Sequence, residues 1–304
     1  MFKKFMQKAL ALAQKGAKST LPNPMVGAVI VKNNRIIGQG YHTAYGKPHA
    51  EIEALKACKI SPKDATLYVT LEPCCHFGKT PPCTKAIIES GIKEVVISAF
   101  DPSKKVNGKG IKELKKAGIK VRVGMLKKEA EELNRIFFTF HTKKRPFVTI
   151  KAAVSLDFCI AKSRTERTFL TGKKEEKYTH TLRATHEAIL VGAGTVLADN
   201  PHLGVRAVEG KDPLRVIMAG PRKLPKNLKI FRDKNVLVLK NKTPKQALTI
   251  LYKMGITSVL VEGGQKIFTS FLQANLVDEI IFFVANIELG KDAVGFVENG
   301  LFKP

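Results

Sequence analysis

The beginning of the chain has apolar side chains at helical spacing. Within residues 2–16 they recur every third or fourth position: Phe2, Phe5, Met6, Ala9, Leu10 and Ala13. This spacing predicts an amphipathic helix that ends near Gly16, since glycine is common at helix C-termini. A proline-rich break follows at 22–24, and then two apolar segments at 26–31 and 35–41 flank a short polar turn. We therefore expect a helix followed by a β-hairpin.

Short apolar segments alternate with amphipathic ones in the rest of the first half. We expect helices from residue 49, at 84–90, at 109–117 and at 127–138, and strands at 66–71, 94–98 and 119–123. Such alternation predicts a sheet with helices on its faces. The polar and basic segment at 139–146 is expected to be a linker, so the predicted domains are residues 1–144 and 145–304.

The second half repeats this alternation. Strands are expected at 147–154, from 188, and at 214–218, 235–239, 257–261 and 279–285, with a polar segment at 162–187. Small residues follow two of these strands, at 192–194 and 263–264, where backbone N–H groups could approach a phosphate. The first alone is explained equally well by packing or a turn, because it lacks the third glycine and the acidic residue of a dinucleotide-binding fingerprint. Together they favour a pocket for a nucleotide phosphate.

The composition is that of a folded protein without a membrane segment. The chain has 304 residues, and 44% of them are apolar, which is enough for two ordinary domains. No apolar segment approaches the length of a membrane span, and the N-terminal residues lack the features of a signal peptide. We therefore expect a cytoplasmic protein with no membrane partner.

The formal net charge of +26 raises the question of nucleic-acid binding. The lysines are spread over every predicted surface, and no recognition motif or interleaving of aromatic and basic residues is present. We expect most of them to lie on solvated helix faces and some to attract a phosphorylated, anionic substrate. A zinc-stabilised nucleic-acid-binding protein is the competing hypothesis from outside the enzymes, but no nucleic-acid partner is predicted.

The cysteines point to a metal site. There are five, an odd number, and three of them lie within ten positions, which favours metal binding in a reducing compartment over disulfides. His49, Cys74 and Cys83 supply one nitrogen and two sulfur ligands, a set that suits a catalytic zinc with an open position for water. Glu51 is not needed as a ligand in this set. In the zinc-dependent base deaminases, a glutamate two residues after a histidine ligand carries protons.

The surroundings of the second ligand leave an alternative open. Cys74 follows a proline, as in the deaminase signature, but eight residues rather than two separate it from Cys83. If Cys74 begins a helical turn, the helix dipole and the zinc together keep its sulfur as a thiolate. A structural zinc site usually has four ligands and would use Cys75 or His76 as the fourth. Glu51 would have no function there, whereas hydrolytic deamination requires it.

With these motifs assembled, the chain resembles the bifunctional riboflavin-biosynthesis deaminase/reductase family. The matching stretches of the first half are Pro22-Asn-Pro-x-Val-Gly27, Pro48-His-Ala-Glu51, Thr70-Leu-Glu-Pro-Cys74 and Gly78-Lys-Thr-Pro-Pro-Cys83. The wide cysteine spacing is what this family shows. The resemblance implies an α/β fold: a cytidine-deaminase-like domain of α/β/α layers, followed by a dihydrofolate-reductase-like α/β domain.

For the first domain, the resemblance implies hydrolytic deamination of a diaminopyrimidinone that carries a ribosylamino phosphate. His49, Cys74 and Cys83 would hold one Zn²⁺ per chain, and Glu51 would carry the protons. The residues expected to line the pocket are Asn23, His42 and Lys79. Each of these three could instead be a turn former or a surface residue.

For the second domain, the resemblance implies NADPH-dependent reduction of the ribosyl group to ribityl, and a homo-oligomer is expected. The matching stretches are Arg145-Pro-Phe-Val-Thr-Ile-Lys-Ala152, Ser155-Leu-Asp157, Leu182-Arg-Ala184, residues 189–201 and Val261-Glu-Gly-Gly264. The implied contacts of NADPH are Val154, Phe169, Thr195, Asp199 and Gly264. The implied contacts of the sugar phosphate are Arg183, Leu203, Arg206 and Glu262.

The second half also departs from the family pattern. Phe158 and Cys159 stand where glycine and a basic residue are usual, Arg167 and Phe169 stand for Ser and Trp, and Asn286 stands for a proline. The part after residue 241 is short, so we expect a second domain shortened at its C-terminal end. These departures motivate an alternative function: a deaminase whose impaired reductase-like domain has a structural role.

Overall fold

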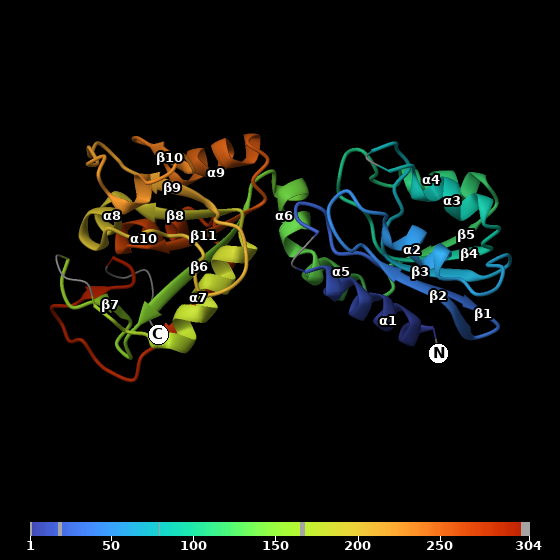
Figure 1. Ribbon diagram of the computed structural model, residues 1–304, viewed down its shortest axis with the longest axis horizontal. Coiled ribbons are helices and arrows are strands. Elements are labelled where there is room, and N and C mark those ends of the chain that lie inside the picture. Colours follow the sequence, from blue (N-terminus) through green and yellow to red (C-terminus); the bar gives the residue numbers. More distant parts are fainter. Residues whose placement is uncertain (1, 18–19, 79, 165–167, 299–304) are drawn as a thin grey trace. The chain divides into compact units, whose positions relative to one another are not determined.

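The computed structural model describes residues 2–17, 20–78, 80–164 and 168–298. Lys79 and Arg167 lie outside these ranges. The chain divides into two compact units, Met1–Lys143 and Lys144–Pro304 (Figure 1). No helix in the described ranges is long and apolar enough to cross a membrane.

The first unit contains a five-stranded sheet with the strand order β2-β1-β3-β4-β5. The strands are β1 (Gly27–Lys32), β2 (Arg35–Tyr41), β3 (Thr66–Leu71), β4 (Glu94–Ala99) and β5 (Lys120–Val123). β1 is antiparallel to both of its neighbours, whereas β3, β4 and β5 are parallel. The turn from β1 to β2 has Asn33 and Asn34 in the left-handed conformation that a tight hairpin requires. The predicted hairpin is thus confirmed.

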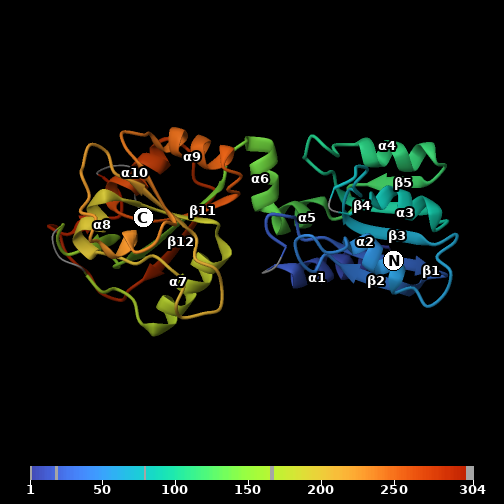
Figure 2. The same cartoon turned by 45° about the horizontal axis from the view of Figure 1, so that its top comes forward.

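Helices cover both faces of this sheet. They are α1 (Lys3–Ala13), α2 (Ala50–Lys56), α3 (Cys83–Glu89), α4 (Lys109–Lys116), α5 (Lys127–Leu133) and α6 (Arg135–Lys143). Successive strand side chains enter different cores, because they point to opposite faces: Val29 and Tyr68 pack on α1, whereas Ile30 and Leu67 join the side chains of α2, α3 and α4. Figures 1 and 2 show α1 on one side of the sheet and α3 and α4 on the other. This is the predicted α/β/α layering.

The end of the first unit differs from the prediction. Residues 127–138 belong to two helices that meet at Asn134, and residues 139–143, predicted as linker, continue α6. The last turn of α6 contains Lys143, and a cation is favourable there because of the helix dipole. The basic composition that suggested a linker thus belongs partly to a helix end, and only residues 144–146 lie between α6 and the next strand.

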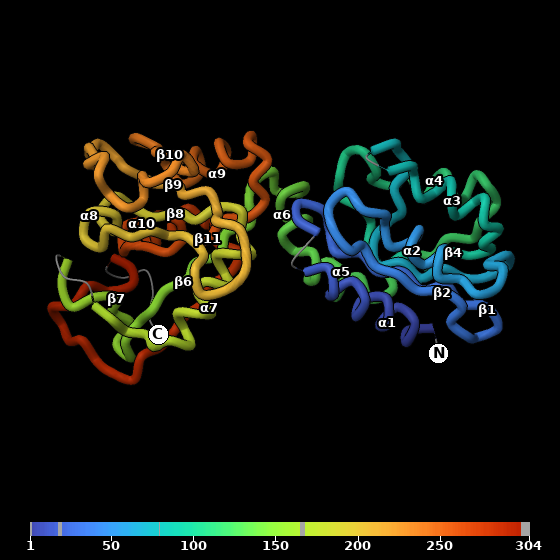
Figure 3. The backbone as a smooth tube through the Cα atoms, in the orientation of Figure 1, coloured from blue at the N-terminus to red at the C-terminus, as the bar shows by residue number. Residues whose placement is uncertain are grey.

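The second unit contains a six-stranded sheet in which all neighbours are parallel, in the order β10-β9-β8-β11-β6-β12. The strands are β6 (Phe147–Val154), β8 (Ala188–Gly192), β9 (Leu214–Met218), β10 (Val236–Leu239), β11 (Ser258–Gly263) and β12 (Glu279–Val284). A separate short ladder joins β7 (Cys159–Ala161) to β13 (Val294–Gly295); Figure 3 labels β7, which lies beside red trace from late in the sequence. All six strands predicted in this half are confirmed.

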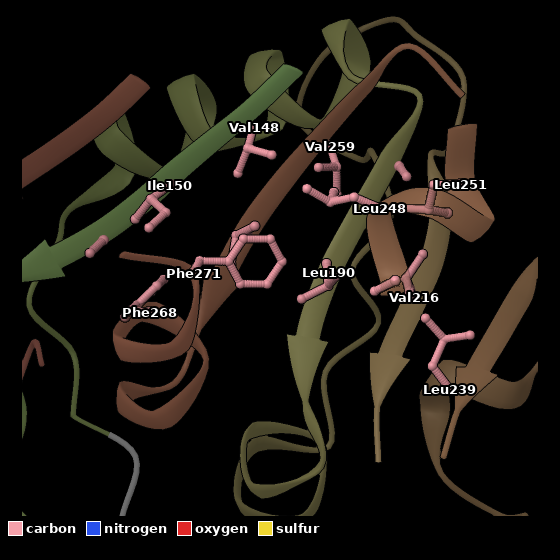
Figure 4. Packing of buried hydrophobic residues seen from close by; sticks show 14 of the residues in the cluster. Val148, Ile150, Leu190, Val216, Leu239, Leu248, Leu251, Val259, Phe268 and Phe271 are labelled. Atoms are coloured by element: carbon pink, nitrogen blue, oxygen red, sulfur yellow. The ribbon is translucent and has the colours of Figure 1, made fainter. Parts of the chain in front are cut away.

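The largest core of the second unit lies between this sheet and the helices α9 (Pro244–Lys253) and α10 (Gln265–Gln273). Figure 4 shows its side chains converging from both layers: Val148, Ile150, Leu190, Val216, Leu239, Leu248, Leu251, Val259, Phe268 and Phe271. Ile189 and Ile217 point to the opposite face and pack with Val196 of α8 (Ala193–Asp199). By the same alternation Lys151 of β6 and Glu262 of β11 lie on the face away from the largest core.

The polar segment at 162–187 contains a helix that the apolar pattern did not predict, α7 (Lys173–Thr185). Only three of its side chains are buried: Thr179, His180 and Leu182. A helix of this kind lacks the apolar stripe by which helices are recognised in sequence. Its start is stabilised by Glu175, whose carboxylate accepts a hydrogen bond from the backbone N–H of Gly172 at 3.0 Å.

The core of the second unit gives a test of stability. Leu251 is completely buried in α9, whereas Met254 at the end of the same helix is 52% exposed. We expect Leu251→Ala to lower the free energy of unfolding by about 2–5 kcal/mol, and Met254→Ala to change it by less than about 0.5 kcal/mol. Urea unfolding followed by circular dichroism measures both. Equal effects of the two substitutions would contradict this packing.

Candidate functional site

Three residues with metal-binding side chains meet in the first unit. His49 precedes the first residue of α2, Cys74 lies in the loop after β3, and Cys83 is the first residue of α3. The His49 Nδ1 atom is 3.5 Å from the Cys74 Sγ atom and 3.3 Å from the Cys83 Sγ atom. All three ligand atoms lie within 4.8 Å of one another. The structure thus brings together the three residues predicted as ligands.

The spacing of these atoms fits a tetrahedral zinc ion. Bonds of about 2.3 Å to sulfur and about 2.0 Å to nitrogen place sulfur and nitrogen roughly 3.5 Å apart at the tetrahedral angle. The two observed sulfur-to-nitrogen distances agree with this value to within 0.2 Å. The side chains of His49, Cys74 and Cys83 would therefore need to move only slightly to hold the metal.

The protein favours a thiolate at Cys74. The Cys83 side chain hydrogen-bonds to this sulfur, and with His49 and the backbone N–H of Cys83 it lowers the pKa of Cys74 to about 4. The Cys83 N–H lies 3.4 Å from the Cys74 sulfur. The pKa of Cys83 is raised by the hydrogen bond to Cys74 and by burial. Cys74 does not begin a helical turn, since the helix beside it begins at Cys83, so the condition under which a helix dipole would act on Cys74 is not met.

Glu51 lies beside this group without belonging to it. It is in the first turn of α2, its side chain is buried, and the three-residue ligand group does not include it. Burial raises the pKa of Glu51 to about 7, and the negative charge of Cys74 adds to this effect. A carboxyl group with such a pKa both accepts and gives up protons near neutrality, which suits a general acid–base.

The two residues that would complete a four-ligand structural site are not in the group. Within the described ranges, the ligand cluster contains neither Cys75 nor His76. The Cys75 sulfur is directed at the carbonyl oxygen of Lys105, 3.9 Å away, and the buried Nδ1 atom of His76 has no hydrogen-bond partner there. Three ligands with an open fourth position are typical of catalytic zinc rather than structural zinc.

A buried carboxylate holds the loop of Cys74 in place. Glu72 accepts hydrogen bonds from the backbone N–H groups of Asp101, Gly108 and Ile111, at 3.3, 2.9 and 3.2 Å. These donors belong to the loop after β4 and to the start of α4. Since Glu72 is two residues before Cys74, it ties the metal-binding loop to α4.

Two of the residues predicted to contact the pyrimidine adjoin the metal ligands. The Nδ1 atom of His42 lies 3.1 Å from the carbonyl oxygen of Pro48, and its Nε2 atom lies 3.1 Å from the Asn23 amide nitrogen. Burial lowers the pKa of His42, so a neutral ring donates from Nδ1 and accepts at Nε2. The ring packs edge-on against that of His49, with centroids 5.3 Å apart. Lys79, the third residue, lies outside the described residues.

In the second unit, two of the predicted substrate contacts form an ion pair. Arg183 of α7 donates from Nε and Nη2 to the two carboxylate oxygens of Glu262 on β11, both at 2.7 Å. Burial by itself would raise the pKa of Glu262, but the charge and hydrogen bonds of Arg183 bring it below its usual value. Glu262 therefore stays ionised in a buried position.

Lys151 joins this pair, although it was not predicted as a site residue. Burial lowers the pKa of Lys151, while the negative charge of Glu262 raises it and the positive charge of Arg183 lowers it. The Lys151 nitrogen lies 5.2 Å from the centre of the Phe283 ring. A lysine within an otherwise apolar buried strand was the signal in the sequence, since a cation there requires an acidic partner.

The loop before β9 approaches the same group. Arg183 also donates to the carbonyl oxygen of Gly204 at 3.3 Å, and the backbone N–H of Arg206 donates to His180 of α7 at 3.1 Å. Leu203 is buried, and the side chain of Arg206 is exposed. The four predicted sugar-phosphate contacts thus come from α7, β11 and this loop, with Arg206 the most accessible.

The residues predicted to contact NADPH are less closely grouped. A Cβ atom added to Gly264 would lie 3.2 Å from the Thr195 hydroxyl oxygen, so these two residues adjoin and a side chain at position 264 would crowd Thr195. Val154 is buried in the largest core, Asp199 is half-buried at the end of α8, and Phe169 is 75% exposed. Gly192 serves packing, because a Cβ atom there would lie 2.8 Å from the Ile267 side chain.

The unusual residues Phe158 and Cys159 are accommodated in the fold. Phe158 adopts a left-handed conformation with φ of 55°, and its ring packs edge-on against Phe282 with centroids 5.5 Å apart. Its carbonyl oxygen accepts a hydrogen bond from the backbone N–H of Phe296 at 2.8 Å. Cys159 is buried. These departures from the family pattern therefore extend the core of the second unit.

Comparison with protein-family models matches both units. Residues 2–99 match the cytidine and deoxycytidylate deaminase zinc-binding region, and residues 146–304 match the RibD C-terminal domain. The riboflavin biosynthesis protein RibD of Aquifex aeolicus is 42% identical over 95% of this chain and 88% of its own length. The RibD protein of Escherichia coli is 36% identical over 96% of this chain and 89% of its own.

Solved structures agree with these matches. The Thermotoga maritima diaminohydroxyphosphoribosylaminopyrimidine deaminase/5-amino-6-(5-phosphoribosylamino)uracil reductase is 41% identical with a TM-score of 0.85, over 97% of this chain and 89% of that one. Acinetobacter baumannii RibD has a TM-score of 0.90 at 37% identity, over 99% and 91% of the two chains. With its metal-ligand group and both of its units matched over nearly their whole length, the chain belongs to the RibD family of riboflavin biosynthesis proteins.

Proposed function

We propose that this chain is a bifunctional enzyme of riboflavin biosynthesis. Its first unit deaminates a diaminopyrimidinone that carries a ribosylamino phosphate, and its second unit reduces the ribosyl group to ribityl with NADPH. The observation that carries the proposal is the buried Glu51 next to the group of His49, Cys74 and Cys83. Family membership supplies the substrate class, since the T. maritima relative is named for both reactions.

For the deamination, His49, Cys74 and Cys83 would hold a zinc ion, which would supply the positive charge that lowers the pKa of a water molecule. Glu51 takes a proton from this water, whose oxygen attacks the amino-bearing ring carbon, and passes that proton to the ring nitrogen. Glu51 then takes the second proton from the new hydroxyl group and passes it to the amino group. The carbon–nitrogen bond breaks, ammonia leaves and the ring carbonyl forms. The raised pKa of Glu51 matches this exchange, because the group must be a base first and an acid afterwards.

Asn23 and His42 orient the pyrimidine beside this centre. One amide hydrogen of Asn23 is used by His42, and within the described residues the Asn23 Oδ1 atom accepts no hydrogen bond. That oxygen is therefore suited to the amino groups of a diaminopyrimidine, which are donors. For Lys79, which lies outside the described residues, a role in binding the pyrimidine rests on the family resemblance alone.

For the reduction, bound NADPH would supply a hydride to the anomeric carbon, and the bond from this carbon to the ring oxygen would break. The ring oxygen must gain a proton, and Lys151 is suited to provide it because burial lowers its pKa. Arg183 and Glu262 hold Lys151 and the sugar hydroxyls in position. The exposed cation of Arg206 is suited to the phosphate. Thr195 and Gly264 line the space proposed for the cofactor.

The comparisons favour this bifunctional reading over a deaminase with an inert second domain. The RibD C-terminal model matches the whole second unit, and Arg183, Glu262 and Lys151 form a charged group there. Because each reaction is assigned to a different unit, we expect that substitutions in one unit can abolish one reaction and leave the other intact.

The first functional test concerns Glu51. We expect Glu51→Gln to lower kcat for ammonia release by about 10²–10⁴-fold, because the amide cannot carry protons. Zinc content, measured by atomic emission, should stay at the wild-type level, since Glu51 is not in the ligand group. Near-normal turnover by the Glu51→Gln protein would contradict the proton-carrying role.

The second test separates metal ligands from neighbouring thiols. Cys83→Ala removes one of the three predicted ligands, so we expect loss of both zinc and ammonia release. Cys75→Ala is the matched control, because Cys75 is outside the ligand group, and it should retain zinc and activity. Loss of zinc from the Cys75→Ala protein would favour the four-ligand structural site.

The third test concerns reduction. Lys151→Met removes the proposed proton donor, and we expect NADPH oxidation with the deaminated intermediate to fall by about 10²-fold or more. Ammonia release by the same protein should be unchanged, because Lys151 is in the other unit. Lys253→Met, at an exposed position of α9, should leave both reactions intact. Absence of NADPH oxidation by the wild type would instead favour the deaminase-only alternative.

A further inference from the structure

The buried side-chain amide of Asn134 makes two hydrogen bonds to the backbone of Met25, a residue far away in the sequence. Asn134 lies between α5 and α6 and is 3% exposed. Its Oδ1 atom accepts the backbone N–H of Met25 at 2.8 Å, and its Nδ2 atom donates to the carbonyl oxygen of the same residue at 2.9 Å. One side chain thus satisfies both backbone groups of Met25, much as a neighbouring strand would.

Met25 lies in the middle of a segment that reaches the deaminase pocket on both sides. Two residues earlier, the Asn23 amide lies 3.1 Å from His42. One residue later, the carbonyl oxygen of Val26 accepts the backbone N–H of His42 at 2.9 Å. The ring of His42 packs on the metal ligand His49. The position of Met25 therefore bears on both residues proposed to orient the pyrimidine.

Asn134 belongs to a part of the chain that neither family model covers. The zinc-binding region of the deaminases matches residues 2–99, and the RibD C-terminal domain begins at residue 146. The metal ligands, Glu51, Asn23 and His42 all lie within the first match. The contact to Met25 thus comes from the junction of α5 and α6, outside the residues matched by the deaminase model.

We propose that Asn134 is a positioning residue for deamination, which fixes the segment at 22–26 so that Asn23 and His42 meet the pyrimidine in the correct place. This inference rests on the proposed deaminase function. The role needs an amide, because the side chain must accept from one backbone group and donate to another. Asn134→Asp keeps only the acceptor, and Asn134→Leu, of similar size, keeps neither.

The experiment is steady-state kinetics of ammonia release by the full-length zinc protein. We expect Asn134→Leu to lower kcat/KM by about tenfold to a hundredfold, since small misplacements of binding groups have effects of this size. The loss should appear mainly in KM, because Glu51 and the ligands are unchanged, and Asn134→Asp should fall between Asn134→Leu and the wild type. Zinc content should be that of the wild type.

A double-mutant cycle distinguishes positioning from general damage to the fold. If Asn134 acts through Asn23, then Asn134→Leu should add less than about a twofold further loss to the Asn23→Ala protein, because coupled residues are not additive. The matched control is Ser98→Ala, which removes a completely buried side chain that bonds to the carbonyl oxygens of Met125 and Leu126. Its KM should be unchanged.

The outcomes separate this inference from the function on which it rests. Failure of the wild type to release ammonia would overturn the proposed function and the inference with it. Wild-type turnover together with unaltered kinetics of Asn134→Leu would overturn the inference alone, as would fully additive losses in the cycle. If Asn134→Leu does not fold, the same cycle is carried out with Asn134→Asp. Amide hydrogen exchange at residues 22–26 that is faster in this variant than in the wild type would then support the inference.

Discussion

Burying a carboxylate is unfavourable unless cations or hydrogen-bond donors compensate for the lost hydration, and both sites of this chain depend on how that compensation is made. Glu51 and Glu262 are both buried acidic residues, but their pKa values are shifted in opposite directions. Burial and the thiolate of Cys74 raise the pKa of Glu51 to about 7. Burial acts in the same direction on Glu262, but Arg183 reverses it and keeps that group charged.

This difference matches the chemistry proposed for each unit. A group that takes a proton from water and returns it to a leaving amine must change its charge during the reaction, so an uncompensated carboxylate suits the deaminase site. A group that holds a lysine and an arginine in place must keep its charge, so an ion pair suits the reductase site. Glu72 shows a third solution, because three backbone N–H groups satisfy its carboxylate and fix the loop that contains Cys74.

Much of the fold could be predicted from the sequence, because the central strands are continuous runs of buried, mostly apolar residues and most helices bury one apolar face. The elements that were missed are those for which this signal is weak or misleading. α7 buries only three side chains, and the basic end of α6 resembled a linker. The missed α7 is the helix that carries Arg183. Lys151 was not predicted as a site residue for a related reason, because its role depends on Glu262 and Arg183, which lie far away in the sequence.

By itself, the sequence determined the layered α/β architecture and singled out the three candidate metal ligands and Glu51 as the candidate proton carrier, because strand and helix periodicity and ligand chemistry are local properties of residue type and spacing. Only the tertiary structure decided that Cys75 and His76 lie outside the ligand group, that the helix beside Cys74 begins at Cys83, and that Lys151 joins Arg183 and Glu262. It also decided that Asn134 reaches back to Met25, 109 residues away. Hydrogen bonds and charge pairs between distant segments depend on how the layers pack, and no local pattern encodes that packing.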